Sequence, residues 1–389
     1  MDLGLLIFAS LIGAIAGMLP GLHANSIAWV FLLADAPSLD TQAMLVALGI
    51  GQATASILSA AYSPSRSTEA LPVAARYRKK GRAMDAVNLH SVGALAGTLA
   101  GVLAWGLMEK WFVKVEPLEN IIIPAVLLAG LLSVLGRIRG PKEKVLALAM
   151  LASAGMCGAV FLAPLAFENI LLALMTGFFA VSALLAGLLE LHPVGTFEAR
   201  AERKIGWKKI ARAWPGLAGG VLVGSIPSMT AHQSLALVEH ASGKMKPSAY
   251  LVAVGMLETI SLLTSIVVFQ AIAKTRTGIA VLVGQAGERT LTSQWPIMAA
   301  ALLASGIGIG FNRTMAGILQ EDGRNWPWKK IYALTLAGLV GLVLYFQPLN
   351  IVPLACATGL GLACEYRGIP KTACMAFLTV PTLGFYLGF

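Results

Sequence analysis

Charged residues are scarce in this sequence. Asp, Glu, Lys and Arg make up 12% of the 389 residues and 57% are hydrophobic, whereas a soluble domain carries about 25% charged residues. The mean hydropathy is correspondingly high, at +0.77. This composition excludes a soluble globular protein and indicates a chain that lies largely in lipid.

Cysteines are few, and the motifs of common enzymes are missing. The four cysteines lie in apolar segments and form no Cys-x-x-Cys pair: Cys157, Cys356, Cys364 and Cys374. We therefore expect neither a disulfide framework nor a metal site. No phosphate-binding loop, nucleophile elbow or Ser/His/Asp set is found, and we interpret His90 and His240 as core or interface residues. The sequence predicts a protein that is not an enzyme and has no cofactor.

Long apolar runs are what the sequence does contain. Runs of about 17 to 22 residues recur along its length, as bilayer-spanning helices require. The predicted helices are 3–19, 43–62, 86–108, 119–136, 144–163, 169–189, 213–226, 249–273, 295–311, 331–346, 350–366 and 371–388, with shorter pieces at 24–34 and 230–240. The first run lacks a basic leader and a cleavage site, so we expect a retained helix and not a signal peptide. The chain is predicted to be an all-α polytopic protein of the cell (cytoplasmic) membrane.

The net charge of +10 comes from basic residues that alternate from loop to loop. Five segments hold most of the 29 Lys and Arg residues: 76–82, 137–144, 200–212, 313–330 and 367–371. The loops between them are nearly free of bases: 109–118, 164–168, 284–294 and 347–350. This alternation follows the positive-inside rule and predicts that the basic segments are cytoplasmic. Because topology explains the charge, we expect no nucleic-acid partner.

Two blocks of sequence occur twice, followed by a basic loop in one copy and a nearly uncharged loop in the other. The block Gly13-Ala-Ile-Ala-Gly17-Met-Leu-Pro20-Gly21-Leu-His23-Ala-Asn25 returns as Gly220-Val-Leu-Val-Gly224-Ser-Ile-Pro227-Ser228-Met-Thr230-Ala-His232, and Leu45-Val-Ala-Leu-Gly49-Ile-Gly-Gln52 returns as Leu251-Val-Ala-Val-Gly255-Met-Leu-Glu258. The basic loop 76–82 follows the blocks of the first half, whereas the nearly uncharged segment 284–294 follows the blocks of the second half. Equivalent loops therefore lie on opposite sides of the membrane. The pattern predicts two inverted-topology repeats, 1–190 and 213–389.

The connector between the repeats, 191–212, differs in kind. Apolar residues such as Ile205 and Trp207 are interleaved there with Lys and Arg. The pattern is typical of an amphipathic helix that lies in the cytoplasmic interface of the membrane. A plain basic linker is the alternative interpretation.

Each copy of the first block breaks a hydrophobic helix at a Gly/Pro cluster. Pro lacks a backbone donor and Gly tolerates unusual turns, and in lipid such a break must be buried in protein or line a watery cavity. A pair of breaks in two halves points to a transporter binding site near the midplane, made by re-entrant half-helices. The predicted substrate-binding residues are Pro20, Gly21, His23, Asn25 and Ser26 in the first copy, and Pro227, Ser228, Thr230, His232 and Ser234 in the second. A plain proline kink between packed helices is the other interpretation.

The helix after each break carries a row of polar residues. The first row is Gln52, Thr54, Ser56 and Ser59, and the second is Glu258, Thr259, Ser261 and Ser265. Most of these residues fit close helix packing, but an acid within an apolar run is a functional-site hypothesis by default. We predict that Glu258, aligned with Gln52 and next to Thr259, couples an ion. It could take a proton, bind Na⁺ or pair with a basic residue.

A third polar stretch follows each row. It holds Arg66 in the first half and Arg276 in the second. Each guanidinium could clamp a carboxylate or a phosphate in a bidentate fork, so we add both to the predicted substrate-binding residues. Snorkelling of these side chains to the membrane interface is the alternative.

Two motifs resemble a known family. The stretch Gly17-Met-Leu-Pro20-Gly21-Leu-His23-Ala-Asn25 and the later Arg78-Lys79-Lys80-Gly81-Arg82-Ala83-Met84-Asp85-Ala86 are similar to the large membrane subunit of tripartite tricarboxylate transporters, the TctA-like permeases. The His-x-Asn after Pro-Gly is similar to the shorter, archaeal-type members. The chain departs from the family pattern at 59–64 and at Pro227-Ser228, where Pro-Gly is expected. The resemblance implies a carboxylate permease and leaves open a binding-protein or small-subunit partner.

We therefore predict a secondary active transporter of a small anionic, carboxylate-type solute, coupled to Na⁺ or H⁺ and working by alternating access. Two alternatives stay open. A flippase for a lipid-linked phosphate, such as a polyprenyl-phosphate carrier, would use the same half-helix N-termini on a headgroup, and a membrane-embedded transferase would need an acid/base pair. The expected partners are the anionic solute or lipid-linked phosphate and membrane lipids, with a homodimer left open.

Overall fold

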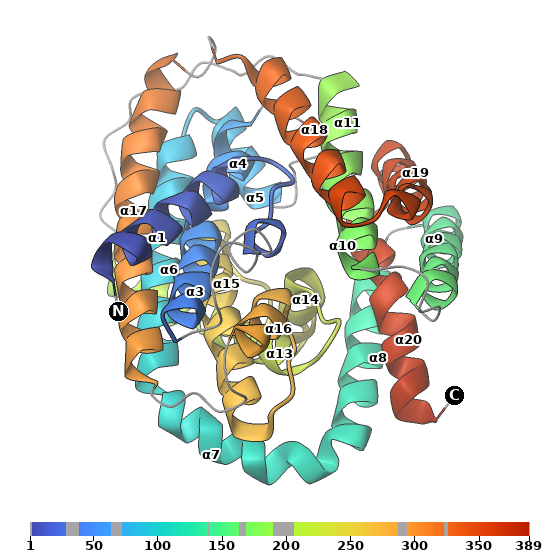
Figure 1. Ribbon diagram of the computed structural model, residues 1–389, viewed down its shortest axis with the longest axis horizontal. Coiled ribbons are helices and arrows are strands. Elements are labelled where there is room, and N and C mark those ends of the chain that lie inside the picture. Colours follow the sequence, from blue (N-terminus) through green and yellow to red (C-terminus); the bar gives the residue numbers. More distant parts are fainter. Residues whose placement is uncertain are drawn as a thin grey trace.

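The computed structural model describes residues 2–28, 39–63, 72–138, 140–162, 169–189, 206–286, 294–322 and 326–388. Every regular element in these ranges is helical (Figure 1). The elements are α1 (Leu3–Met18), α3 (Leu39–Ala55), α4 (Ile57–Tyr62), α5 (Pro72–Lys79), α6 (Ala83–Leu103), α7 (Trp105–Val115), η2 (Glu116–Leu118), α8 (Glu119–Arg137), α9 (Pro141–Leu162), α10 (Ile170–Met175), η3 (Thr176–Val181), α11 (Ser182–Leu189), α12 (Trp207–Ala211), α13 (Pro215–Ser225), α14 (Ala231–Ser242), α15 (Pro247–Ile272), α16 (Gly278–Gln285), α17 (Trp295–Asp322), α18 (Trp328–Phe346), η4 (Pro348–Asn350), α19 (Ile351–Arg367), η5 (Lys371–Met375) and α20 (Ala376–Leu387). Within the described residues, 9 stretches are long and apolar enough to cross a membrane. The prediction of an all-α polytopic membrane protein is confirmed at this level.

The central helix is α15. Proline at its first position, Pro247, supplies a helical φ and needs no hydrogen-bond partner. A helix that is apolar all round is buried, and every residue from Leu251 to Phe269 is buried except Glu258. The one acidic side chain in this stretch is therefore also the one that keeps access to space outside the packed core.

The helices form two groups, which we call the first and the second bundle. The first bundle contains α1, α3 to α6 and α13 to α17, in which α15 packs along α6 and α13, and α3 packs along α1 and α17. The second bundle contains α8 to α11 and α18 to α20, in which α19 packs on η3, α11 and α9, and α20 packs on α9 and α8. Figure 1 shows α7 running along one edge of the molecule from the first bundle to the second. Both bundles draw helices from both halves of the chain.

The repeated glycines bring helices of the first bundle into close contact. A Cβ atom at Gly17 of α1 would lie 2.4 Å from the Gln52 carbonyl oxygen of α3, and one at Gly224 of α13 would lie 2.3 Å from the Ser261 carbonyl oxygen of α15. No larger residue fits at these distances without moving a backbone. Small residues at a fixed spacing are how membrane helices approach closely, so the repeated block sets the same helix–helix contact in each half.

Two predicted loop boundaries were wrong. Residues 109–118 were predicted as a loop, but they belong to α7 and η2. The reason is an apolar stripe at helical spacing, Trp105, Met108 and Phe112, which is buried while Lys110 is exposed. In the same way α17 continues through the basic start of the predicted loop 313–330 as far as Asp322.

The connector lies mostly outside the described residues. Of 191–212, the structure describes only residues 206–212, which contain the short helix α12. Trp207 is exposed there. The predicted amphipathic helix in the interface therefore stays a prediction.

Candidate functional site

The first break separates α1 from a helical turn at residues 24–28. Gly21 has a φ of 80°, a left-handed conformation that glycine adopts without steric cost. The backbone N–H of Ser26 donates to the His23 carbonyl at 3.0 Å, which closes the new turn. The His23 side chain is exposed, whereas the Ser26 side chain is buried. Pro20, just before the turn, is buried as well.

The second break separates α13 from α14. Ser228 has a φ of 64°, and Thr230 caps α14 in a reciprocal capping box with Gln233. The Ser234 hydroxyl donates to the Gly219 carbonyl of α13 at 2.6 Å. This bond holds α14 against α13, so the two helices form a hairpin whose tip is the break.

The two breaks have the same backbone conformation and comparable neighbours. Gly21 and Ser228 occupy the same position in the repeated block, and both are left-handed. A Cβ atom at Gly21 would lie 3.1 Å from Ala180 Cα, in the π-helical segment η3. The Ser228 hydroxyl lies 2.7 Å from the Thr382 hydroxyl of α20. Each break of the first bundle therefore abuts the second bundle, on the last membrane helix of its own half.

The first break also meets the segment that follows α15. A Cβ atom at Gly278, the first residue of α16, would lie 2.4 Å from Asn25 Nδ2. Thr277 caps α16, and its hydroxyl lies 2.8 Å from the Ser265 hydroxyl of α15. Amide and hydroxyl groups thus gather where the first break approaches the N-terminus of α16, an end that favours negative charge.

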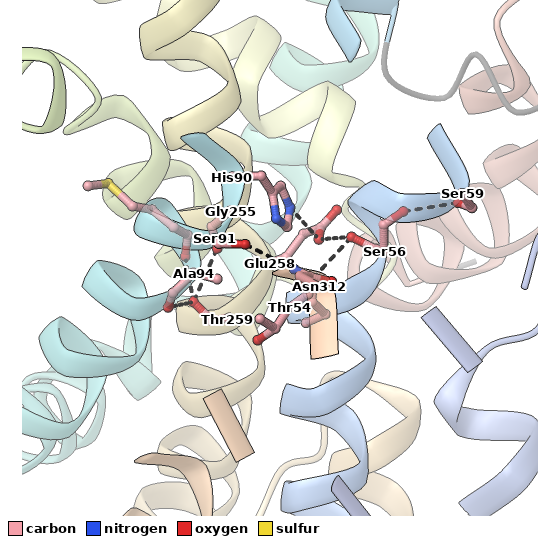
Figure 2. Close-up of polar contacts among 12 residues, drawn as sticks. Thr54, Ser56, Ser59, His90, Ser91, Ala94, Gly255, Glu258, Thr259 and Asn312 are labelled. Carbon is pink, nitrogen blue, oxygen red and sulfur yellow. Dashed lines mark hydrogen bonds and ion pairs between the residues drawn. The ribbon is translucent and has the colours of Figure 1, made fainter. Parts of the chain in front are cut away.

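Glu258 lies at the crossing of helices from both halves (Figure 2). Its Oε2 atom is 2.6 Å from the Ser56 hydroxyl, at the junction of α3 and α4, and 3.2 Å from His90 Nε2 on α6. The His90 side chain is 0% exposed and the Glu258 side chain is 26% exposed. His23 of the first break lies within electrostatic reach of this carboxylate. One carboxylate oxygen is therefore fixed by protein donors, while the residue keeps some access to open space.

A second polar contact lies beside this carboxylate. The buried Asn312 side chain of α17 donates from Nδ2 to the Thr54 carbonyl at 2.8 Å and to the Ser91 hydroxyl at 3.0 Å. Its Oδ1 atom and His90 Nδ1 are buried without a hydrogen-bond partner among the described residues. Thr54 lies two residues before Ser56 on the chain and Ser91 directly follows His90, so the contacts of Asn312 adjoin those of Glu258 (Figure 2). Two buried acceptor atoms, Asn312 Oδ1 and His90 Nδ1, thus belong to residues that surround this carboxylate or its partners.

A family comparison over nearly the whole chain identifies the family. The family model described as "Tripartite tricarboxylate transporter TctA family" matches residues 3–376. The chain belongs to the TctA family. Neither a curated protein nor a solved structure matches it. Membership makes the protein a membrane transporter component of a family that works with other components, and it is consistent with the absence of an enzyme activity.

Several of the predicted substrate-binding residues of this TctA-family protein have structural partners. Thr230 and Ser234 hold the α13–α14 hairpin, as described above. Arg276 is 5% exposed and its Nη2 atom pairs with Glu119 of α8, while its Nε atom is buried without a hydrogen-bond partner among the described residues. Pro227 lies half-buried at the tip of the hairpin and His232 is exposed. Arg66 lies outside the described residues.

The same glutamate at the start of α8 holds Lys274. The ammonium group of Lys274 lies 2.8 Å from Glu119 and 3.1 Å from Glu116. The hydrogen bond with Glu119 raises the pKa of Lys274 above its usual value. Arg276 Nη1 also donates to the Tyr386 hydroxyl of α20 at 3.3 Å. These groups form an ion-pair cluster that joins the segment after α15 to the second bundle.

The predicted ion-coupling residues of the TctA-family protein lie in different contacts. Gly17 packs on the Gln52 carbonyl, and its repeat counterpart Gly224 packs on the Ser261 carbonyl. In the structure, Ser261 and not Glu258 is therefore the equivalent of Gln52. The sequence alignment of these helices was about one turn out of register. Thr259 donates to the Ala94 carbonyl of α6 at 3.0 Å and serves helix packing. Of the roles left open for Glu258, a proton, Na⁺ or a basic partner, the structure shows a partner: the Ser56 hydroxyl and the His90 imidazole contact its carboxylate.

Three residues around Glu258 were not predicted from the sequence to be part of a site. His90 was interpreted as a core or interface residue, and Ser91 and Asn312 were not singled out. A polar residue in a membrane helix is costly, and this was the available signal. Which of these residues meet is a matter of contacts between distant helices, which the sequence does not display. Among the described residues, no group of His, Cys, Asp and Glu could hold a metal ion.

Proposed function

We propose that this TctA-family protein is the permease of a secondary transporter, which moves a small carboxylate-type anion together with a cation by alternating access. The observation that carries the proposal is the pair of equivalent left-handed breaks, at Gly21 and Ser228, which abut the second bundle. Paired breaks of this kind are the usual binding site of secondary transporters with repeated halves.

The contacts between helices support the two inverted repeats, 1–190 and 213–389, with 191–212 between them. α1 packs along α3 in the first half, and α13 packs along α15 in the second. Across the halves α6 packs along α15, and α17 packs along α3. Each contact has a counterpart under exchange of the halves, as a pseudo-two-fold axis requires. The basic loop in one half and its nearly uncharged counterpart in the other support an inverted relation between the repeats.

The polar groups at the first break support an anionic substrate. His23 is exposed, and Asn25 lies against the start of α16 beside Thr277. Hydroxyl, amide and imidazole donors bind a carboxylate, and the N-termini of half-helices add a favourable dipole. In this proposal the substrate lies between the two breaks. Glu258, within electrostatic reach of His23, links the substrate site to the coupling cation.

The test is uptake of radiolabelled citrate, succinate and related carboxylates by the purified protein in liposomes. His23→Ala and Ser228→Ala should each reduce uptake at least about tenfold, the effect of losing about 1.4 kcal/mol of binding. Ser242→Ala is the matched control, since its hydroxyl bonds only within α14, to the Val238 carbonyl. Uptake that both variants leave unchanged would contradict the proposed site.

The same vesicles separate the alternatives. Movement of a labelled polyprenyl phosphate between leaflets, without carboxylate uptake, would identify a flippase. A covalent product formed from that lipid would identify a transferase. Either result replaces the proposed carrier.

A further inference from the structure

We infer that the coupling cation is a proton, bound by Glu258 and held by Ser56 and His90. The inference rests on the proposed cation-coupled transport and names the ion at its coupling site. It follows from the hydrogen-bond arrangement around one carboxylate oxygen.

The Ser56 hydroxyl can serve the carboxylate in either charge state. It lies 2.6 Å from Glu258 Oε2 and 3.0 Å from the Ala53 carbonyl oxygen, but it has one hydrogen to give. When Glu258 is ionised, Ser56 donates to Oε2. When Oε2 carries a proton, the acid donates to the Ser56 oxygen, and Ser56 turns its hydrogen to Ala53. A proton can therefore bind and leave while the heavy atoms stay in place.

His90 completes the arrangement. Its Nε2 atom lies 3.2 Å from Oε2 and can donate to that oxygen in both states, because a protonated carboxyl group still accepts. The imidazole is fully buried, and its Nδ1 atom has no hydrogen-bond partner among the described residues. A buried acceptor of this kind is costly. We interpret it as a second place for the proton.

The same geometry disfavours sodium. A hard cation prefers several oxygen ligands, yet the side chains within hydrogen-bond distance of Oε2 are one hydroxyl and one imidazole nitrogen. Both direct hydrogens at the oxygen that would have to bind the metal. A proton needs only one acceptor at a time.

Other charged groups near Glu258 and His90 do not neutralise the Glu258 carboxylate in place of a proton. His23 of the first break interacts electrostatically with Glu258. α17 brings the neutral Asn312 to the site, and the adjacent Arg313 is exposed. Tyr250, near the start of α15, interacts electrostatically with Glu258 and also with Arg76, Arg137 and Glu239, and Lys274 and Arg276 follow the end of α15. Among the described residues no Lys or Arg forms an ion pair with Glu258, so its charge is left for a mobile cation to neutralise.

Infrared difference spectroscopy of the full chain in lipid tests this inference without a substrate. A pH titration should reveal the carbonyl stretch of a protonated carboxylic acid that disappears as the pH rises. The band should be absent in Glu258→Gln and shifted in Ser56→Ala, which keeps the acid. It should be unchanged in Glu143→Gln, the matched control on the exposed start of α9.

Two results would overturn the inference. One is a band that Glu258→Gln and Ser56→Ala both leave unchanged. The other is a band that NaCl, but not choline chloride, removes at constant pH, which would indicate a sodium site. Circular dichroism spectra and the Tm of each variant confirm that it is folded.

Liposome transport distinguishes this inference from the proposed function. Citrate uptake driven by a pH gradient in the absence of sodium supports both. Uptake that requires a sodium gradient contradicts proton coupling and supports the proposed carrier function. If the band is assigned to Glu258 but the protein moves none of the carboxylates, the result supports the proton site and contradicts the proposed carrier function.

Discussion

At the scale of single residues, the left-handed serine is the most informative departure from the family pattern. Ser228 stands where the first copy has Gly21, and it adopts the same left-handed conformation. For an L-residue this conformation costs roughly 1–2 kcal/mol. The Ser228 hydroxyl bonds to Thr382 of α20, which offsets part of that cost. The sequence could predict the break from Pro227, but it gave no sign that the turn would keep its shape without glycine.

We expect glycine to be better tolerated than alanine at this position. Ser228→Ala loses the bond to Thr382 and keeps the strained φ, whereas Ser228→Gly loses the bond and relieves the strain. Ser228→Gly should therefore be the more stable variant by about 1 kcal/mol, measured as Tm in detergent. At Ser225, in the last turn of α13, the order should reverse, because alanine favours a helix over glycine. The same order at both sites would contradict a strained turn.

The buried arginine gives a second prediction at this scale. Arg276 is 5% exposed and pairs with Glu119. Removing one partner of a buried pair leaves an uncompensated charge and costs about 3–5 kcal/mol, so Glu119→Gln should lower the Tm sharply. The double variant Glu119→Gln/Arg276→Met should recover much of the loss, because it leaves no buried charge. A double variant no more stable than Glu119→Gln alone would show that the pair is not what stabilises this region.

At the scale of elements, the repeated glycines explain both what the sequence predicted and where it failed. They marked the two helices that carry the breaks, and the structure has α1 and α13 at those positions. The alignment of the following helices was out of register, because a run of small and apolar residues matches itself after a shift of about one turn. The contacts of Gly220 with the Leu257 backbone and of Gly224 with the Ser261 backbone fix that register. The partners of Glu258 were missed for a related reason, since His90 and Ser56 reach it from other helices.

The contact between α1 and α3 should be intolerant of one methyl group. A Cβ atom at Gly17 would lie 2.4 Å from the Gln52 carbonyl oxygen, so Gly17→Ala must separate the two helices. Overpacking of this kind costs about 1–3 kcal/mol, which should appear as a lower Tm. Gly306→Ala on α17 is the matched control, because no atom lies within 4 Å of its added Cβ. Equal Tm values for the two variants would argue against close helix packing at Gly17.

At the scale of the whole molecule, the chain builds each bundle from both halves. The helices that carry the breaks and Glu258 gather in the first bundle, and the last helices of each half gather in the second. Hydropathy predicted twelve long apolar helices, whereas 9 stretches of the described residues are long and apolar enough to span a membrane. It also could not sort them into bundles, since all are apolar in a similar way. The cluster of Glu119, Lys274 and Arg276 joins the two bundles. Any movement of one bundle against the other must break these ion pairs or move the segment after α15 together with α8.

The membrane topology is the prediction on which the inverted repeats depend. The basic segments should be cytoplasmic, so the connector and the α7 region should lie on opposite sides. In a background without native cysteines, we expect Lys110→Cys to react with an impermeant maleimide added to intact cells. Trp207→Cys should react only after the cells are opened. Both side chains are exposed in the structure, so a difference in labelling would report the side of the membrane and not burial. Labelling of Trp207→Cys from outside would reverse the connector, and with it the argument that equivalent loops of the two repeats lie on opposite sides.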